Sequence, residues 1–179
     1  MRIRPAEDMD LNAVAQSYRN LLMHEMENNG FSNWQFGVYP TTEVSVHAHA
    51  KRELFVAEIQ GRITGSMILT SRQPKEYKNI SWNCPDAKKI LVVHTLCVPP
   101  RHSGKGYGHA MIRYALEWAE DQEYDVVRCN FWEKNAPAKH VLEDMGFQIC
   151  GTARFLPASL PEETDHFMEY NLKQQKQMY

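Results

Sequence analysis

The amino-acid sequence predicts an α/β (α+β) fold built on a mixed, mostly antiparallel central sheet of about seven strands, flanked by about four helices. Three observations lead to this prediction. Short apolar runs with the length of strands recur along the chain, and amphipathic segments with helical spacing lie between them. The order of the two kinds of segment reads β α α β β β α β α β β, which indicates a sheet with helices on both faces.

The first half of the chain contributes three of the expected strands. Residues 2–5 form a short strand, and residues 54–59 and 63–69 form a hairpin around a turn at 60–62. A helix is expected where apolar residues recur at helical spacing, at Leu11, Val14, Ala15, Tyr18, Leu21 and Leu22. A second helix runs from Thr41 or Thr42 to about Lys51.

The second half begins with a long polar connection at 71–88 and continues with a buried strand at 90–98. The next helix has one apolar stripe, formed by Tyr107, Ala110, Met111, Tyr114, Ala115 and Trp118. The remaining elements are a strand at 125–131, a helix that begins at Asn135 and ends at Gly146, a strand at 147–155, a loop at 156–164 and a strand at 165–172. Two strand–helix–strand units, 90–131 and 125–155, therefore follow the hairpin.

Composition bounds the class of protein. The chain has 179 residues, which suits one domain over residues 1–173 with a polar tail at 174–179. Lys and Arg number 20 and Asp and Glu number 22, so no bulk attraction to nucleic acid or to an anionic membrane is expected. No apolar run has the length of a membrane span or a signal peptide. The four cysteines are not closely spaced, which favours reduced thiols in a cytoplasmic protein.

A metal site is not expected. His47 and His49 are two residues apart on a predicted helix, and residues with this spacing do not share a face. No other spacing of cysteine and histidine residues suggests a zinc site.

The strand at 90–98 leads into a glycine-rich turn that opens a helix. Such a turn is a phosphate-binding device, because N–H groups at a helix start have no partner inside the helix and the helix dipole is positive there. A P-loop is excluded, since Lys105 stands between glycines and Tyr107 follows Gly106. The dinucleotide fingerprint is also excluded, because His109 stands where its third glycine is required.

The pattern that remains is Arg101-x-x-Gly104-x-Gly106, which resembles the acetyl-CoA motif of the GNAT superfamily of N-acetyltransferases. Two other segments strengthen the resemblance: a Leu-x-Val-x-Pro ending of the strand, Leu96-Cys97-Val98-Pro99-Pro100, and an Asn-x-x-Ala…Gly-Phe pattern formed by Asn135, Ala138, Gly146 and Phe147. The order of elements is similar to the superfamily core over nearly the whole chain.

The resemblance implies an acetyl-CoA-dependent N-acetyltransferase without a metal, acting on a primary amine of a small molecule or of a peptide or protein N-terminus. It also implies that main-chain groups of Leu96 and Val98 pair with the pantetheine arm where the strand splays from the next one. Main-chain N–H groups from His102 to Gly108 are expected to cradle the pyrophosphate. The implied cofactor site is formed by Leu96, Cys97, Val98, Arg101, His102, Ser103, Gly104, Lys105, Gly106, Tyr107, Gly108 and Asn135. A homodimer is one option for the assembly.

The sequence indicates the catalytic residues less clearly than the cofactor site. His94 is the candidate general base, because imidazole titrates near neutral pH and the family often places a base on this strand. Glu58 is the second candidate. The family's usual acid is a tyrosine seven residues after the asparagine, where this chain has Leu142. Water, Tyr107 or Tyr39 could supply the proton instead, and the sequence leaves this choice open.

Two further alternatives follow from the sequence. The aromatic loop at 31–40 carries Trp34 and Tyr39, which could form a wall of the acceptor pocket or pack the loop onto the body. The absence of tyrosine at Leu142 also allows a second function, a catalytically weak or inactive CoA-binding or sensor module with the same fold.

Overall fold

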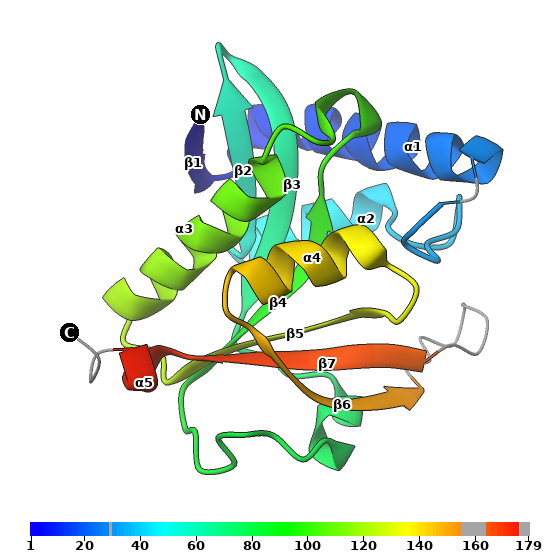
Figure 1. Ribbon diagram of the computed structural model, residues 1–179. Coiled ribbons are helices and arrows are strands. Elements are labelled where there is room, and N and C mark those ends of the chain that lie inside the picture. The colour runs from blue at the N-terminus through cyan, green and yellow to red at the C-terminus, as the bar shows by residue number, and fades with distance from the viewer. Residues whose placement is uncertain (29, 155–163, 176–179) are drawn as a thin grey trace. The chain divides into compact units, whose positions relative to one another are not determined.

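The structure is a computed structural model that describes residues 1–28, 30–154 and 164–175. Its strands and helices are β1 (Arg2–Pro5), α1 (Leu11–Asn28), α2 (Thr42–Ala50), β2 (Leu54–Ile59), β3 (Arg62–Thr70), β4 (Ile90–Cys97), α3 (Tyr107–Asp121), β5 (Val126–Trp132), α4 (Ala136–Asp144), β6 (Gln148–Arg154), β7 (Thr164–Asn171) and α5 (Leu172–Gln175), as Figure 1 shows. The strands follow the order β1-β2-β3-β4-β5-β7-β6 in a seven-stranded sheet. The predicted fold class is confirmed, with α5 as an additional single turn.

Strand directions agree with the prediction of a mixed sheet. The pairs β1–β2, β2–β3, β5–β7 and β6–β7 are antiparallel, whereas β4–β5 is parallel. The sequence treats residues 125–155 as a strand–helix–strand unit, but β7 lies between β5 and β6. The last strand of the chain is therefore inserted into that unit, so β5 and β6 are not neighbours.

Two compact units make up the chain, Met1–Leu69 with Thr95–Met111 and Thr70–His94 with Ile112–Tyr179. The first unit has a core in which Val14 and Tyr18 of α1 pack with Ala48 of α2 and with apolar residues of β2, β3 and β4. Residues Ile63–Thr70 of β3 are all buried, so both faces of this strand are covered. The hairpin turn is shorter than predicted. Gln60 and Gly61 have φ angles of 51° and 73°, which suits a two-residue turn, and β3 begins at Arg62.

The second unit has its own core around Tyr77, Val92 and Phe167. Tyr77 comes from the predicted polar connection at 71–88, where a 3₁₀ segment, Lys75–Asn79, brings its ring 5.4 Å from that of Phe167. A buried ion pair lies in the same unit: Arg128 Nε of β5 donates to Glu169 Oε2 of β7 at 2.8 Å. Most of the predicted loop at 156–164 and the tail residues 176–179 lie outside the described residues.

The helix after the glycine turn is confirmed, but its buried stripe is rotated from the predicted one. Met111 and Ala115 are fully buried as expected, and Ile112, Leu116 and Ala119 join them. The other predicted stripe residues, Tyr107, Ala110, Tyr114 and Trp118, are only half-buried. These four residues lie on the flank of the buried stripe, and the long side chains among them stay partly in water.

None of the helices in the described ranges has the length and hydropathy required to cross a membrane. The single domain over residues 1–173 stays a prediction.

Candidate functional site

The central strand β4 changes its backbone conformation at Thr95. Its φ angle is 49°, in the left-handed region that a β-branched residue rarely adopts. The residues of β4 that pair with β5 are Ile90, Leu91 and Val92, so the paired stretch ends before this point. Strained backbone of this kind persists where the surrounding structure holds it in place, and it concentrates at functional sites. Thr95 directly precedes Leu96, which is where the sequence predicts the cofactor contacts to begin.

The side chain of Thr95 is held by the aromatic loop. The Tyr39 hydroxyl lies 2.5 Å from Thr95 Oγ1, and either oxygen can be the donor. Burial raises the pKa of Tyr39 above its ordinary value, and the Thr95 hydrogen bond opposes part of that rise. Tyr39 is therefore protonated at neutral pH and has a proton that it can donate.

Trp34 packs against Tyr39 in an edge-to-face contact, with ring centroids 5.8 Å apart and an interplanar angle of 78°. The main chain of the loop closes on itself, because the N–H of Gln35 donates to the carbonyl of Tyr39 and the N–H of Tyr39 to that of Gln35. The predicted self-packing of the loop is thus present. Its tyrosine also reaches β4, so a role for Trp34 and Tyr39 in an acceptor pocket remains a prediction.

Two buried hydroxyl groups lie close together in the first unit. They belong to Tyr18 of α1 and Ser66 of β3. Burial raises the pKa of Tyr18, and the nearby Cys97 thiol raises it further. Buried polar groups are usually paired, and a hydrogen bond between Tyr18 and Ser66 lowers the pKa of Tyr18 against these two effects.

The glycine turn has the backbone that a phosphate cradle requires. After the 3₁₀ segment Pro100–His102, Gly104 and Gly106 have φ angles of 71° and 75°, and α3 begins at Tyr107. A Cβ built on either glycine meets no heavy atom within 4 Å, so the space beside the turn is open. The positive φ angles and the open space together suit a close approach of an anion to main-chain N–H groups.

Two of the main-chain N–H groups that are expected to cradle the pyrophosphate have hydrogen-bond partners within the protein. The N–H groups of His102 and Ser103 donate to the carbonyls of Pro99 and Pro100, at 2.8 and 3.0 Å. The first bond of α3 runs from the Ala110 N–H to the Gly106 carbonyl at 3.1 Å. The N–H groups that this geometry leaves for a ligand are those of residues 104–108.

Positive charge lies beside this turn. Arg101 and Lys105 are exposed, and Lys105 Nζ donates to the Arg101 carbonyl at 3.0 Å. Burial lowers the pKa of His102, and the two neighbouring cations lower it further. His102 is therefore neutral near pH 7, and its buried Nδ1 has no hydrogen-bond partner among the described residues.

The candidate bases differ in their surroundings. His94 is half-buried on β4, between the buried residues Val93 and Thr95. Glu58 is engaged elsewhere, because its Oε2 accepts from Arg4 Nε at 3.0 Å and from a terminal Arg4 nitrogen at 2.8 Å. The ion pair with Arg4 favours a structural role for Glu58. Cys97 is fully buried, and burial raises the pKa of its thiol, which excludes an activated nucleophile at this position.

Several other residues that the sequence singles out have surroundings that point to structural roles. Asn135 caps α4, since its Oδ1 accepts from the Ala138 N–H at 3.0 Å. Leu142 is buried in α4, with 6% of its surface exposed. His47 is exposed on α2, whereas His49 is half-buried with its Nε2 3.6 Å from an Asp8 oxygen. All four cysteines are free thiols.

The comparison with known proteins fits this arrangement. Residues 15–147 match the family model of the Acetyltransferase (GNAT) family. Streptothricin acetyltransferase of Streptomyces lavendulae is 32% identical over 86 residues, which cover 48% of this chain and 43% of the relative. Streptothricin acetyltransferase of Escherichia coli is 28% identical over 93 residues, which cover 51% and 50%. The chain thus spans about half the length of the curated relatives that it matches.

Solved structures show the same fold at lower identity. A GNAT-family acetyltransferase from Streptococcus agalactiae has a TM-score of 0.79 at 16% identity, covering 95% of this chain and 94% of its own. The yncA protein from Salmonella typhimurium, solved with its cofactor acetyl-CoA, has a TM-score of 0.71 at 18% identity, covering 96% and 94%. The family match covers well over half of the sequence, and the chain belongs to the GNAT acetyltransferase family.

Proposed function

We propose that this protein is an acetyl-CoA-dependent N-acetyltransferase that moves an acetyl group directly from the CoA thioester to a primary amine of a small molecule. The observation that carries the proposal is the conformation of the chain around β4. The strand β4, with a positive φ angle at Thr95, leads into a turn with two positive-φ glycines and open space, at the start of a helix. This arrangement presents main-chain donors where a phosphate-bearing cofactor can reach them.

The residues present fit acetyl-CoA. The N–H groups of residues 104–108 would donate to the pyrophosphate, Lys105 would add positive charge beside it, and main-chain groups of Leu96 and Val98 would pair with the pantetheine arm. The bound cofactor supplies an activated acetyl group as a thioester. Asn135 Oδ1 is committed to its helix cap, so a contribution from this residue to the pantetheine comes from its amide nitrogen.

Side chains and main-chain groups of this protein then accept and donate the protons of the reaction. The attacking amine must be neutral, and His94 accepts its proton directly or through water. The amine nitrogen bonds to the acetyl carbon, the bond from carbon to sulfur breaks, and the leaving thiolate takes up a proton. Main-chain N–H groups of Cys97 or Val98 polarise the carbonyl oxygen as charge builds on it. We assign proton donation to the thiolate to Tyr39, because its hydroxyl is held at Thr95, next to Leu96.

The acceptor class follows from the relatives. Both curated relatives are streptothricin acetyltransferases, so we propose a small-molecule amine in preference to a peptide N-terminus. The four free cysteines support a reducing, cytoplasmic location. The deciding experiment is release of free CoA thiol from acetyl-CoA with streptothricin, a panel of small amines and peptides with free N-termini. Turnover with a small amine, confirmed by the mass of the acetylated product, supports the proposal, and turnover with peptides alone overturns the acceptor class.

A second function is favoured by one observation, the buried Leu142 at the position of the family's usual tyrosine. It is a CoA-binding or sensor module with little or no transfer activity. Tight acetyl-CoA binding in a calorimetric titration, with no thiol release across the whole panel, would establish it. Leu142→Tyr gives a further distinction, because a faster variant means that thiolate protonation limits turnover in the natural chain.

A further inference from the structure

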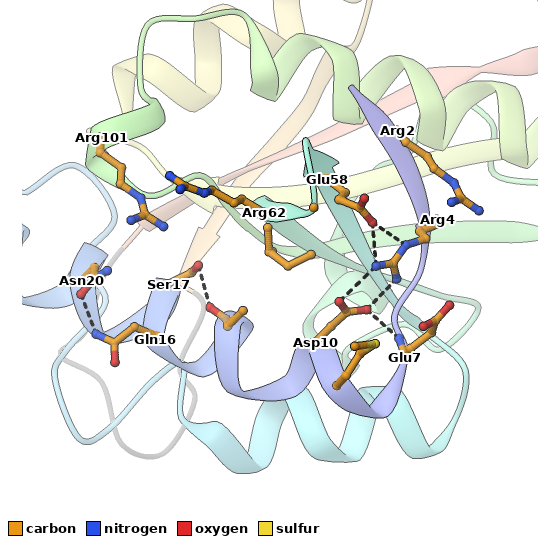
Figure 2. A pocket seen from close by; sticks show the side chains of 14 residues that line it. Arg2, Arg4, Glu7, Asp10, Gln16, Ser17, Asn20, Glu58, Arg62 and Arg101 are labelled. Atoms are coloured by element: carbon orange, nitrogen blue, oxygen red, sulfur yellow. Dashed lines mark hydrogen bonds and ion pairs between the residues drawn. The ribbon is translucent and has the colours of Figure 1, made fainter.

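We propose that a pocket in the first unit is a second anion site, which binds the phosphate monoester of a small polyol and is separate from the acetyl-CoA turn. The pocket has a volume of about 640 Å³ and is formed by β1, the first turns of α1, the β2–β3 hairpin and the 3₁₀ segment before the glycine turn. Figure 2 shows its side chains. A volume of this size is typical of small-molecule sites.

One wall of the pocket is a closed ionic network. Arg4 donates to both oxygens of Asp10, at 2.6 and 3.1 Å, and to Glu58 Oε2 at 2.8 and 3.0 Å. Asp10 also accepts from the Glu7 N–H at 2.8 Å. The Arg4 and Asp10 side chains are only 13% and 6% exposed, so this wall is rigid and its charges already have partners. The wall supports the pocket but leaves little of its charge for a ligand.

The opposite side of the pocket carries cations without counterions. Arg62 of the hairpin and Arg101 of the 3₁₀ segment are both exposed, and neither pairs with a carboxylate among the described residues. Figure 2 shows their guanidinium groups turned toward the same part of the pocket. Two like charges that share a concave site repel one another, and an anion placed between them removes that repulsion.

The side chains that line the pocket indicate which kind of anion it binds. Guanidinium groups match phosphate oxygens with paired hydrogen bonds, which favours a phosphate group. Below the two arginines, Gln16 Nε2 donates to Asn20 Oδ1 at 2.8 Å, which leaves the Gln16 carbonyl and the Asn20 amide nitrogen for hydroxyl groups. The lining residues include no aromatic ring on which a nucleobase could stack. A phosphorylated polyol satisfies these groups better than a nucleotide.

The pocket and the acetyl-CoA turn share one residue. Arg101 lines the pocket, whereas the cradle at residues 104–108 does not. A ligand in the pocket therefore leaves the cradle open. If Arg62 and Arg101 instead held a phosphate of acetyl-CoA itself, the two ligands would compete for the same groups.

The test is calorimetric titration of glucose 6-phosphate into the full chain at saturating acetyl-CoA, with glucose, inorganic phosphate and citrate as comparison probes. We expect binding of glucose 6-phosphate, weaker binding of inorganic phosphate and none of glucose. Arg62→Gln should weaken the binding of glucose 6-phosphate at least about tenfold, because a charge-assisted bond is lost. The affinity for acetyl-CoA should not change, and circular dichroism checks the fold of the variant.

Arg19→Gln is the matched control, since Arg19 is an exposed arginine of α1 outside the pocket lining and its loss changes the net charge equally. It should leave the affinity for glucose 6-phosphate within about twofold, since an exposed charge outside the lining is screened by salt. Three results would overturn the proposal: no binding to the natural chain at millimolar concentration, equal binding by Arg62→Gln, or competition between glucose 6-phosphate and acetyl-CoA. Competition would assign the arginines to the cofactor.

Discussion

The Tyr39 hydroxyl lies 2.5 Å from Thr95 Oγ1, and Thr95 is the residue at which β4 enters the left-handed region. A phenol from a loop 56 residues earlier in the chain is thus held beside the last residues of the central strand. The chain has Leu142 where its family usually places a tyrosine acid, and this contact puts a different tyrosine next to the residues expected to hold the pantetheine.

Tyr39→Phe should lower kcat by about a hundredfold, because positioned proton donors contribute on that order. Acetyl-CoA affinity should change little, since the ring and its contact with Trp34 are kept. Stopped-flow measurement of thiol release together with calorimetry separates the two effects. Tyr107→Phe is the comparison, because Tyr107 is the other tyrosine that the sequence offered. A slow Tyr107→Phe beside an unaffected Tyr39→Phe would reverse the assignment.

Gly106→Glu should abolish measurable acetyl-CoA binding. Gly106 has a φ angle of 75° and open space beside it, so glutamate adds a strained residue and a negative charge where the pyrophosphate is expected. Gly61→Glu is the matched control, because Gly61 has a φ angle of 73° and equally open space in the β2–β3 turn. Calorimetric titration measures the acetyl-CoA affinity of both variants. Equal affinities would mean that the turn is not part of the cofactor site.

His94→Ala should slow turnover much more than it weakens acetyl-CoA binding. A base acts on the amine, so its loss appears in kcat and in the acidic limb of the pH–rate profile. His102→Ala is a useful comparison, because His102 is a neutral imidazole at the glycine turn and should affect cofactor binding before chemistry. Turnover of His94→Ala equal to that of the natural chain would leave His94 with a structural role only.

The sequence predicted most of the fold because the features that define it are local. Helical spacing at 11–22, alternation in the hairpin and glycines at 104 and 106 each fix an element without reference to distant residues. The strand order was harder. The placement of β7 between β5 and β6 depends on long-range pairing, such as Cys129 with Met168, which no local pattern encodes.

The candidate site, like the fold, could be predicted from the sequence only where its features are local. The glycine turn has a residue pattern, whereas the positive φ of Thr95 has none, because threonine on an apolar strand normally predicts regular β structure. The ion pair of Glu58 with Arg4 joins residues 54 positions apart, so no local sequence pattern predicts it. The same holds for the Tyr39–Thr95 contact, on which the proposal of Tyr39 as the proton donor rests.

Glu169→Gln should lower the free energy of unfolding by about 3–5 kcal/mol, because it leaves a buried arginine without its counterion. The Arg128 and Glu169 side chains are 5% and 1% exposed and 2.8 Å apart. Glu143→Gln is the control, since Glu143 and Lys139 form a half-exposed pair at 3.8 Å and should contribute at most about 1 kcal/mol. Urea unfolding of the two variants measures both changes, and equal losses would mean that Arg128 finds sufficient compensation from Gln73, the Cys84 carbonyl and Trp82.

Asp165 should make stability fall as pH rises from about 4 to about 6. Burial raises the pKa of Asp165 from 3.8 to about 6, and Glu133 adds to the rise, while the hydrogen bond from Asn130 Nδ2 opposes it. Because the pKa is higher in the folded chain than in the unfolded chain, the folded state binds more protons in this range, and ionisation of the buried carboxyl costs stability above it. The cost is at most about 3 kcal/mol, at 1.36 kcal/mol for each pKa unit.

Asp165→Asn should therefore be more stable than the natural chain at pH 7.5 and similar to it near pH 4. Asn130 Nδ2 lies 2.6 Å from Asp165 Oδ2, and the amide oxygen of the variant can still accept this hydrogen bond. The orientation of Asn130 is fixed, because its Oδ1 accepts from the Tyr77 hydroxyl at 2.9 Å. Asp121→Asn, at an exposed position, is the control and should leave the pH dependence unchanged. Urea midpoints measured from pH 4 to pH 8 give the test. An unchanged slope in Asp165→Asn would show that Asp165 ionises without cost in the folded chain, and a variant weaker at every pH would show that the hydrogen bond from Asn130 requires a carboxylate.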